Sequence, residues 1–169
     1  LGEMASVSTL HGYCQSLLHQ QGNLRGGLTA NFKCYPGLVS LIKKDWFWIL
    51  NTVAPTFVNE MRSLECSEEH DSFYTTRSDY YDAVDFDDSV YRTYKKFLEN
   101  PELVPPYKLI LIDEFQDFNR LEAGIIAQLS NTNPIVIAGD DDQALYSQLR
   151  GASWDFIRSY YAGGEYAVF

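Results

Sequence analysis

Two short apolar runs, Leu109–Ile112 and Ile135–Ala138, dominate the hydrophobic pattern of the chain, and each leads directly into acidic residues. The segment between them is amphipathic from about Asn119, with inward positions at Leu121, Ile125, Ile126 and Leu129. Strands that are apolar on both faces belong in the middle of a parallel sheet covered by helices. The pattern therefore predicts an α/β fold with a strand–helix–strand unit at its centre.

The acidic residues after each predicted strand are the main candidates for chemistry. The first cluster is Asp113, Glu114 and Asp117, and the second is Asp140, Asp141 and Asp142. In open parallel sheets, ligands bind outside the carboxyl ends of the strands. Two acidic clusters at one edge would repel each other without a cation, so we expect a Mg²⁺-nucleotide as the ligand.

The remaining pattern is mostly helical. Amphipathic spacing predicts helices at about residues 10–21, 36–53, 56–64, 87–100 and 153–161. Residues 23–35 read as a connection with at most one short strand. The Glu-, Asp-, Ser-, Thr- and Tyr-rich segment 65–88 is interpreted as a mobile or weakly packed loop. Trp46, Phe47 and Trp48 are interpreted as helix core or as a face packed on a neighbouring domain.

Composition narrows the class of protein. The 169 residues contain 46% hydrophobic residues and carry a net charge of −10, which fits a folded chain and disfavours broad electrostatic capture of nucleic acid. The three cysteines, Cys14, Cys34 and Cys66, have no CxxC spacing and are expected to be buried free thiols. No apolar run approaches the roughly 20 residues that span a bilayer. We expect a cytoplasmic protein with no membrane partner.

The pair Asp113–Glu114 suits phosphoryl transfer. One carboxylate can hold Mg²⁺, while the other orients or deprotonates an attacking water. Such sites also need a phosphate cradle, but the chain contains no GxxxxGK[ST], and neither Gly26-Gly27 nor Gly163-Gly164 is followed by Lys. The sequence thus supplies half of a nucleotide site. Acidic residues that merely cap helices after strands remain an alternative at this point.

Four strings extend the argument by resemblance. LILIDEFQDFN resembles the Walker B-type motif of the UvrD/Rep/PcrA helicases of superfamily 1, and IAGDDDQALYSQLRGAS resembles the next motif of that family. STLHGYCQSLL is similar to the family's segment near the DNA path. VDFDDSVYRTYKKFLENPEL is similar to the helix before the central strand. Residues 22–81 are placed by position alone.

The resemblance implies a fold and a domain division. It implies a partial RecA-like (P-loop NTPase) parallel sheet with a mostly helical insertion. Residues 1–21 and 106–169 would form the core of the first motor domain, and residues 22–105 the insertion subdomain with an acidic loop near 65–88. The chain would be a fragment, and the rest of the same polypeptide would supply the Walker A segment and a second motor domain.

The resemblance also implies roles at the nucleotide. Asp113 would bind the Mg²⁺ of ATP, and Glu114 would activate the hydrolytic water. Gln143 would sense the γ-phosphate and couple hydrolysis to movement, with help from Gln116 and Asp140. These residues define the expected catalytic and ATP-binding set.

A second set of residues would serve the DNA. Thr9 and His11 would lie along single-stranded DNA with Tyr146 nearby, and Arg150 would link its motif to the DNA track or to the second motor domain. The parent protein would be an ATP-dependent DNA helicase or translocase that moves 3′ to 5′ on single-stranded DNA. One departure is Leu149, at a position where the family usually has Trp or Phe that can stack on a base.

Three alternatives remain open. The first is a degenerate, non-catalytic helicase-like subunit that binds DNA or acts as a scaffold, which Leu149 and the acidic balance favour. The second is a metal-dependent nuclease or polymerase, suggested by Gly139-Asp140-Asp141, and the third is a purely structural α/β domain. The pathway, whether repair, recombination, conjugation or defence, and the oligomeric state stay undetermined by the sequence.

Overall fold

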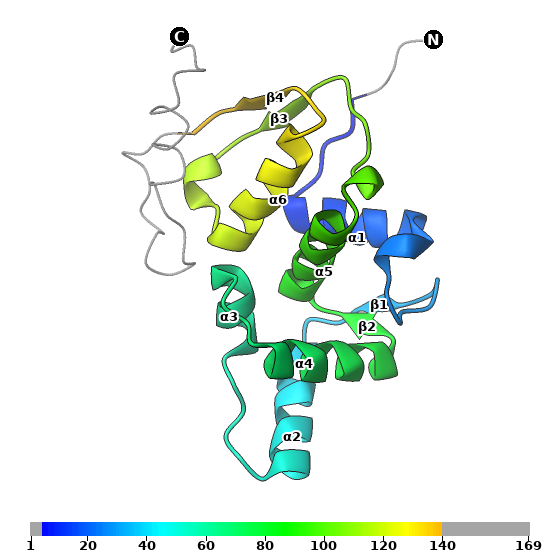
Figure 1. Ribbon diagram of the computed structural model, residues 1–169, viewed down its shortest axis with the longest axis vertical. Helices are drawn as coiled ribbons and strands as arrows, with labels where there is room; N and C mark the ends of the chain where they lie inside the picture. The colour runs from blue at the N-terminus through cyan, green and yellow to red at the C-terminus, as the bar shows by residue number, and fades with distance from the viewer. Residues whose placement is uncertain (1–4, 140–169) are drawn as a thin grey trace. The chain divides into compact units, whose positions relative to one another are not determined.

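The computed structural model describes residues 5–139, and these residues form two compact units (Figure 1). Among the described residues, the first unit comprises residues 5–58 and 67–93, and the second comprises residues 59–66 and 94–139. Two helices, α3 (Phe57–Ser63) and α5 (Phe86–Glu99), have residues in both units. Each unit is described by itself below.

The first unit is mostly helical. Its elements are, in chain order, α1 (Leu10–Gln20), the 3₁₀ helix η1 (Gly22–Leu24), β1 (Lys33–Cys34), α2 (Leu38–Leu50), the start of α3, α4 (Glu68–Tyr81), β2 (Ala83–Val84) and the start of α5. β1 and β2 form a parallel two-stranded sheet in which Lys33 pairs with Ala83 and Cys34 with Val84. The buried side chains of this unit include Leu17, Leu18, Leu24, Phe32, Leu38, Ile42, Trp46, Phe57, Tyr74 and Val84.

Helices α1, α2, α3 and α5 match the predicted helices to within a few residues. Helix α1 begins after Thr9, whose side chain accepts a hydrogen bond from the N–H of Gly12 and so caps the helix. Helix α2 ends at Asn51, which adopts the left-handed conformation at φ 53°. The spacing of apolar residues was sufficient to find these helices because each has a buried stripe.

The prediction of a mobile loop near residues 65–88 is wrong. Residues 68–81 form the 14-residue helix α4. Ser67 caps it by accepting a hydrogen bond from the N–H of His70. Three acidic residues in the first turn, Glu68, Glu69 and Asp71, interact favourably with the positive end of the helix dipole. The buried face of α4 is polar as well as aromatic, with Tyr74 and Ser78 fully buried, so no apolar stripe revealed it.

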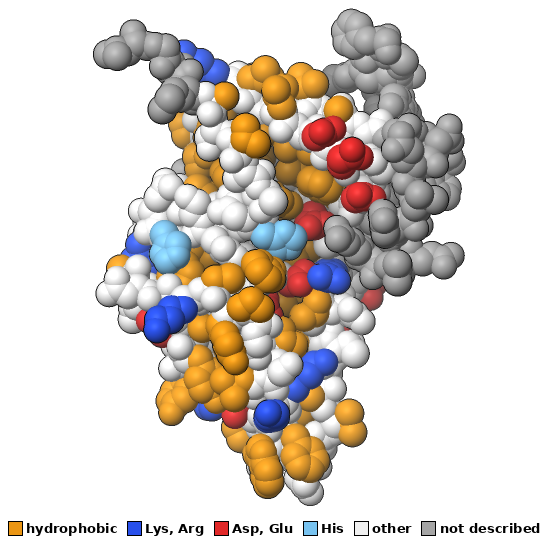
Figure 2. All heavy atoms as spheres, turned by 180° about the vertical axis from the view of Figure 1, so that it is seen from behind, with side chains coloured by type: hydrophobic (Ala, Val, Ile, Leu, Met, Phe, Trp, Pro, Cys, Tyr) orange, Lys and Arg blue, Asp and Glu red, His pale blue; other side chains and the backbone are white. Residues whose placement is uncertain are grey.

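Trp46, Phe47 and Trp48 divide between core and surface. Trp46 is buried, and its ring meets the edges or faces of Phe57, His70 and Phe73. Phe47 and Trp48 are 49% and 81% exposed, and Ile49 and Leu50, which follow them at the end of α2, are exposed as well. Exposed hydrophobic side chains gather at the bottom of Figure 2. The predicted core role therefore holds for the first of the three aromatic residues only.

The second unit contains the strand–helix–strand pattern. Its elements are the rest of α3, the rest of α5, the 3₁₀ helix η2 (Pro101–Leu103), β3 (Ile110–Ile112), the 3₁₀ helix η3 (Phe115–Asp117), α6 (Arg120–Ser130) and β4 (Ile135–Ile137). β3 and β4 pair in parallel, and Ile110, Leu111 and Ile112 lie opposite Ile135, Val136 and Ile137. The predicted parallel pairing is confirmed.

The two faces of this small sheet differ in burial. Ile110, Ile112, Ile135 and Ile137 are half-buried, whereas Leu111 is 71% exposed and Val136 is 51% exposed. Because side chains alternate along a strand, one face is covered and the other is open among the residues that the structure describes. The expectation of a sheet covered on both faces does not hold for these residues.

The compact units follow boundaries other than those of the predicted domains. Helix α1 belongs to the first unit, and residues 94–105 belong to the second. Compact units reflect packing within the chain, so the predicted division into a motor core and an insertion stays a prediction.

Two further expectations concern cysteines and membranes. Cys14, Cys34 and Cys66 form no disulfide bond, but only Cys14 is buried; Cys34 is exposed and Cys66 is half-buried. The prediction of buried thiols is thus wrong for two of the three. Among the described residues, no helix has the length and hydropathy needed to cross a membrane.

Candidate functional site

Backbone hydrogen bonds fix the turn after β3 against the residue after β4. Ala138 donates its N–H to the carbonyl of Ile112 at 2.7 Å, and its carbonyl accepts from the N–H of Phe115 at 3.1 Å. Asp113 and Glu114 lie between these two anchored positions. The carboxyl ends of the two strands therefore meet at one edge, and the first acidic cluster lies at that edge.

The turn holds Asp113 and Glu114 in a defined conformation. Asp113 Oδ1 accepts from the N–H of Glu114 at 3.0 Å, and Glu114 adopts the left-handed region at φ 53° and ψ 38°. A non-glycine residue in that region costs of order 1–3 kcal/mol, and such strain clusters at functional sites. Both side chains are exposed, so a ligand at this edge can reach them.

Gln116 orients the carboxylate of Glu114. Its side-chain amide nitrogen donates to Glu114 Oε2 at 2.5 Å, and Gln116 is only 2% exposed. A buried amide has few alternative positions, so it restricts the rotation of the carboxylate that it binds. One oxygen of Glu114 is thereby engaged, and the exposed carboxylate has a restricted orientation.

Helix α6 stabilises the same turn from its other end. Asn119 accepts from the N–H of Glu122, and Glu122 Oε2 accepts from the N–H of Asn119, which together form a capping box. Phe115 is fully buried, and its ring lies 5.1 Å from that of Phe118. The acidic turn is thus held between β3, β4 and a well-capped helix.

The carboxylates of this edge provide part of the oxygen ligands that Mg²⁺ needs. Within residues 5–139, no three His, Cys, Asp or Glu side chains lie close enough together to hold a metal ion on their own. In nucleotide sites, Mg²⁺ is held by one or two carboxylates together with substrate phosphates and water. Asp113 provides an exposed carboxylate oxygen at the strand end, so the residues present fit a Mg²⁺ that arrives with a nucleotide.

Thr9 and His11 lie at the start of α1, in the first unit. The Thr9 hydroxyl oxygen accepts from Gly12 as the helix cap, which leaves its O–H proton available to a phosphate oxygen. The ring of His11 meets the edge of Phe86 at 6.1 Å between centroids and at 90°. The structure therefore brings one predicted DNA residue, His11, together with an aromatic side chain from α5.

Phe86 is a candidate that the sequence reasoning missed. It is 47% exposed, although its neighbours Asp85 and Asp87 are only 4% and 8% exposed. The buried side chains on either side fix the backbone at Phe86, and its exposed ring can contact a ligand. The signal was present in the string DFDD, where an aromatic residue interrupts acidic residues at a helix start.

Four predicted site residues, Asp140, Gln143, Tyr146 and Arg150, lie outside the described residues, as does Leu149. Their predicted roles stay predictions. Asp113, Glu114 and Gln116 lie together in the second unit, and Thr9 and His11 lie together in the first.

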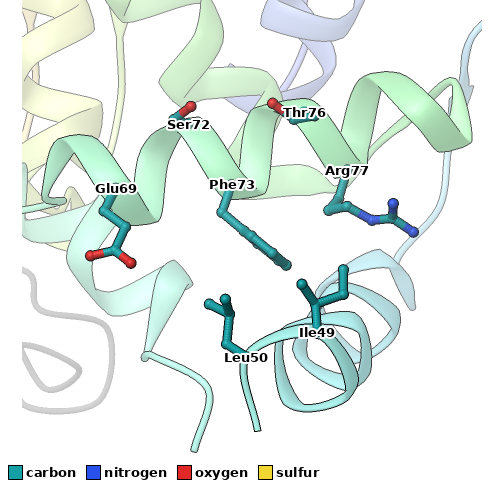
Figure 3. A pocket seen from close by; sticks show the side chains of 7 residues that line it. All are labelled: Ile49, Leu50, Glu69, Ser72, Phe73, Thr76 and Arg77. Atoms are coloured by element: carbon teal, nitrogen blue, oxygen red, sulfur yellow. The ribbon is translucent and has the colours of Figure 1, made fainter. Parts of the chain in front are cut away.

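A pocket of about 480 Å³ lies between α2 and α4 in the first unit (Figure 3). Figure 3 shows Phe73 pointing from α4 toward Ile49 and Leu50, with Glu69 and Arg77 on the same helix. Arg77 is already paired with Asp45 at 2.7 Å. Glu69 is the one carboxylate of the lining, and the lining guanidinium is already engaged, so we assign the chemistry to the turn after β3 and not to this pocket.

Comparison with known proteins identifies relatives among helicases. Residues 52–162, more than half of the chain, match the family "UvrD/REP helicase N-terminal domain". The chain is 40% identical to "Probable DNA helicase II homolog" of Mycoplasma capricolum over 46% of this chain and 11% of that protein. It is 26% identical to "ATP-dependent DNA helicase UvrD1" of Mycobacterium leprae over 91% of this chain and 26% of that protein.

"DNA helicase II" of Escherichia coli is 35% identical over 46% of this chain and 11% of its own length. The chain thus spans about a tenth to a quarter of the length of these relatives. The family match includes both strands of the candidate site and the acidic turn between them. The chain belongs to the UvrD/REP helicase N-terminal domain family.

Proposed function

We propose that the protein that contains this chain is an ATP-dependent DNA helicase that translocates 3′ to 5′ on single-stranded DNA. The observation that carries the proposal is the pair Asp113–Glu114 at the end of β3, with Glu114 held by Gln116, in a chain of the UvrD/REP helicase family. The relative named above as an ATP-dependent DNA helicase supports the nucleotide and the DNA as ligands.

The proposal gives roles to Asp113, Glu114 and Gln116 in the turn. Asp113 would hold Mg²⁺, which would neutralise charge on the ATP phosphates when bound. Glu114 would accept a proton from the attacking water as the water oxygen bonds to the γ-phosphorus and the bond to the ADP oxygen breaks. Gln116 would keep Glu114 oriented, while Asp140 and Gln143 would respond to the γ-phosphate, in line with the predicted RecA-like core.

DNA binding is proposed for the first unit. The Thr9 hydroxyl would donate to a phosphate, and the exposed ring of Phe86, beside His11, would stack on a base. Tyr146 and Arg150 would add to this path. With a net charge of −10, such contacts would be local and directional, because an acidic chain disfavours broad electrostatic capture of nucleic acid.

A strand-displacement assay with the protein at its full natural length tests the proposal. The substrates are one duplex with a 3′ single-stranded tail and the same duplex with a 5′ tail, each with and without ATP and Mg²⁺. We expect ATP-dependent displacement of the 3′-tailed duplex only. Displacement of the 5′-tailed duplex alone would show translocation from 5′ to 3′ and contradict the proposed polarity.

The competing hypothesis is a non-catalytic helicase-like subunit, which Leu149 and the acidic balance favour. It predicts that the protein binds single-stranded DNA but hydrolyses no ATP and displaces neither duplex. That result would overturn the helicase proposal and support the degenerate subunit.

A further inference from the structure

Helix α5 begins on a buried hydrogen-bond network that the proposed chemistry does not use. Asp85 follows β2 directly, and its Oδ1 accepts from the N–H of Asp88 at 2.8 Å, so Asp85 caps the helix. Its other oxygen, Oδ2, accepts from the hydroxyl of Tyr74 at 2.8 Å. Tyr74 belongs to α4 and is completely buried. The start of α5 is therefore joined to α4 through one tyrosine hydroxyl.

The same helix start is fixed from its other side. Asp88 is 1% exposed; it accepts from the hydroxyl of Ser78 at 2.9 Å and from the guanidinium of Arg92 at 3.1 Å. Arg92 Nη1 also lies 2.8 Å from Asp79 Oδ1 and forms an ion pair with it. The first turn of α5 thus has buried polar partners on both sides of Phe86.

Because Asp85, Asp88 and Tyr74 are buried, each relies on the others for its hydrogen bonds and charge interactions. Removal from water and the nearby Asp88 raise the pKa of Asp85 to about 6, and burial raises the pKa of the Tyr74 hydroxyl. A carboxylate at this depth is stable only where donors reach it. Tyr74 is such a donor, together with the N–H of Asp88. Loss of the tyrosine hydroxyl would release one oxygen of the helix cap.

We propose that Tyr74 is a positioning residue for DNA binding, because its hydrogen bond to Asp85 fixes the start of α5 and thereby holds the exposed ring of Phe86 beside His11. Tyr74 is buried and does not touch DNA itself. The inference rests on the proposed function, since it assigns the first unit's aromatic contact to single-stranded DNA. It adds a residue that neither the motif strings nor the exposed surface identify.

The experiment measures ATP hydrolysis by the protein at its full natural length as a function of single-stranded DNA concentration. Phe86→Ala should raise the DNA concentration for half-maximal stimulation roughly 5- to 150-fold, the loss expected for one stacked base. Tyr74→Phe should raise this concentration roughly twofold to tenfold, because the Phe86 ring is still present but is no longer preorganised for binding. The rate at saturating DNA and the rate without DNA should stay unchanged in Tyr74→Phe.

Tyr81→Phe is the matched control. Tyr81 lies in the same helix and its hydroxyl also donates to a carboxylate, Asp45, at 2.7 Å, but Asp45 is not part of the network at the start of α5. We expect Tyr81→Phe to leave the half-maximal DNA concentration unchanged. An equal effect of both variants would overturn the inference, because the loss of any α4 tyrosine hydroxyl that donates to a carboxylate would then explain it.

The double variant Tyr74→Phe/Phe86→Ala separates positioning from general stability. If Tyr74 acts through Phe86, the double variant should bind DNA no more weakly than Phe86→Ala alone. Additive effects of the two substitutions on DNA binding would contradict the inference. A Tyr74→Phe variant that loses DNA-independent hydrolysis to the same extent as DNA binding would also contradict it. A protein with no DNA-stimulated hydrolysis in the wild type would instead overturn the proposed function on which the inference rests.

Discussion

Gln116 and Glu114 form the contact that distinguishes the acidic turn from a simple helix start: a buried amide donates to the Oε2 of an exposed carboxylate at 2.5 Å. The two residues are separated by Phe115, which is buried and bonded to Ala138 through its N–H. The exposed carboxylate is therefore attached to the sheet through both its backbone and its side chain. This arrangement suits a base that must point in one direction.

The first prediction concerns this contact. Gln116→Ala should lower the DNA-stimulated rate of ATP hydrolysis roughly 10- to 100-fold, the usual cost of losing a residue that orients a catalytic group. The DNA concentration for half-maximal stimulation should not change, because Gln116 lies at the nucleotide turn. Gln128→Ala, which removes an amide from α6, is the control and should hydrolyse ATP normally. Equal rates for the two variants would argue against an orienting role.

The second prediction concerns the capping box of α6. Asn119→Ala removes the acceptor for the N–H of Glu122 and should lower the free energy of unfolding by about 1 kcal/mol. Asn131→Ala changes the same residue type at the other end of α6 and should stay within about 0.5 kcal/mol of the wild type. Chemical denaturation followed by circular dichroism measures both. A larger loss for Asn131→Ala would contradict the assignment of the cap.

The third prediction concerns pH. Because the pKa of Asp85 in the folded protein is about 6, above its ordinary value of 3.8, the folded state binds this proton more tightly than the unfolded state. The contribution of Asp85 to stability is therefore complete at low pH and is lost as pH rises through about 4 to 6. Asp85→Asn cannot lose a proton in this way. Its stability relative to the wild type should rise by about 2–3 kcal/mol between pH 4 and pH 7.

Denaturation of both proteins at several pH values measures this difference. Asp87, Asp88 and Tyr74 are present in both proteins, so the difference between the two pH profiles reports the titration of Asp85 together with its coupling to Asp88. A difference that is constant from pH 4 to pH 7 would show that Asp85 is ionised throughout that range.

Part of the fold could be predicted from the sequence because its signals are local. The strands β3 and β4 and the helices with an apolar stripe follow from spacing and capping residues alone. Helix α4 could not be found this way, because its buried contacts, Tyr74 to Asp85 and Ser78 to Asp88, are polar and join residues distant in sequence. The covering of the sheet was overestimated, since apolar composition does not show which face is buried.

The candidate site was predictable to a similar extent. Asp113 and Glu114 follow from their place after an apolar strand, but the hydrogen bond from Gln116 to Glu114 depends on a left-handed turn that the sequence does not reveal. Phe86 was missed because the usual expectation is a buried phenylalanine between exposed aspartates. The structure has the reverse: Phe86 is exposed, and Asp85 and Asp87 are buried.

The fourth prediction concerns close packing in the first unit. A Cβ atom at Gly27 would lie 2.3 Å from Asp79 Oδ2, and Asp79 is the partner of Arg92. Gly27→Ala should therefore displace Asp79 and lower the free energy of unfolding by about 1–3 kcal/mol. At Gly22 a Cβ would meet nothing within 4 Å, so Gly22→Ala should have little effect. Thermal denaturation compares the two, and equal stability would contradict the described packing.

Glu114, as the base in a DNA-stimulated ATPase, is the residue on which the proposed function depends most. The decisive measurement is ATP hydrolysis by the protein at its full natural length, with and without single-stranded DNA, for the wild type, Glu114→Gln and the control Glu102→Gln, which changes an exposed glutamate of η2. We predict DNA-stimulated hydrolysis in the wild type and in the control, and a loss of roughly 10²–10⁴-fold in Glu114→Gln. Equal hydrolysis by all three proteins, or none by the wild type, would contradict the account.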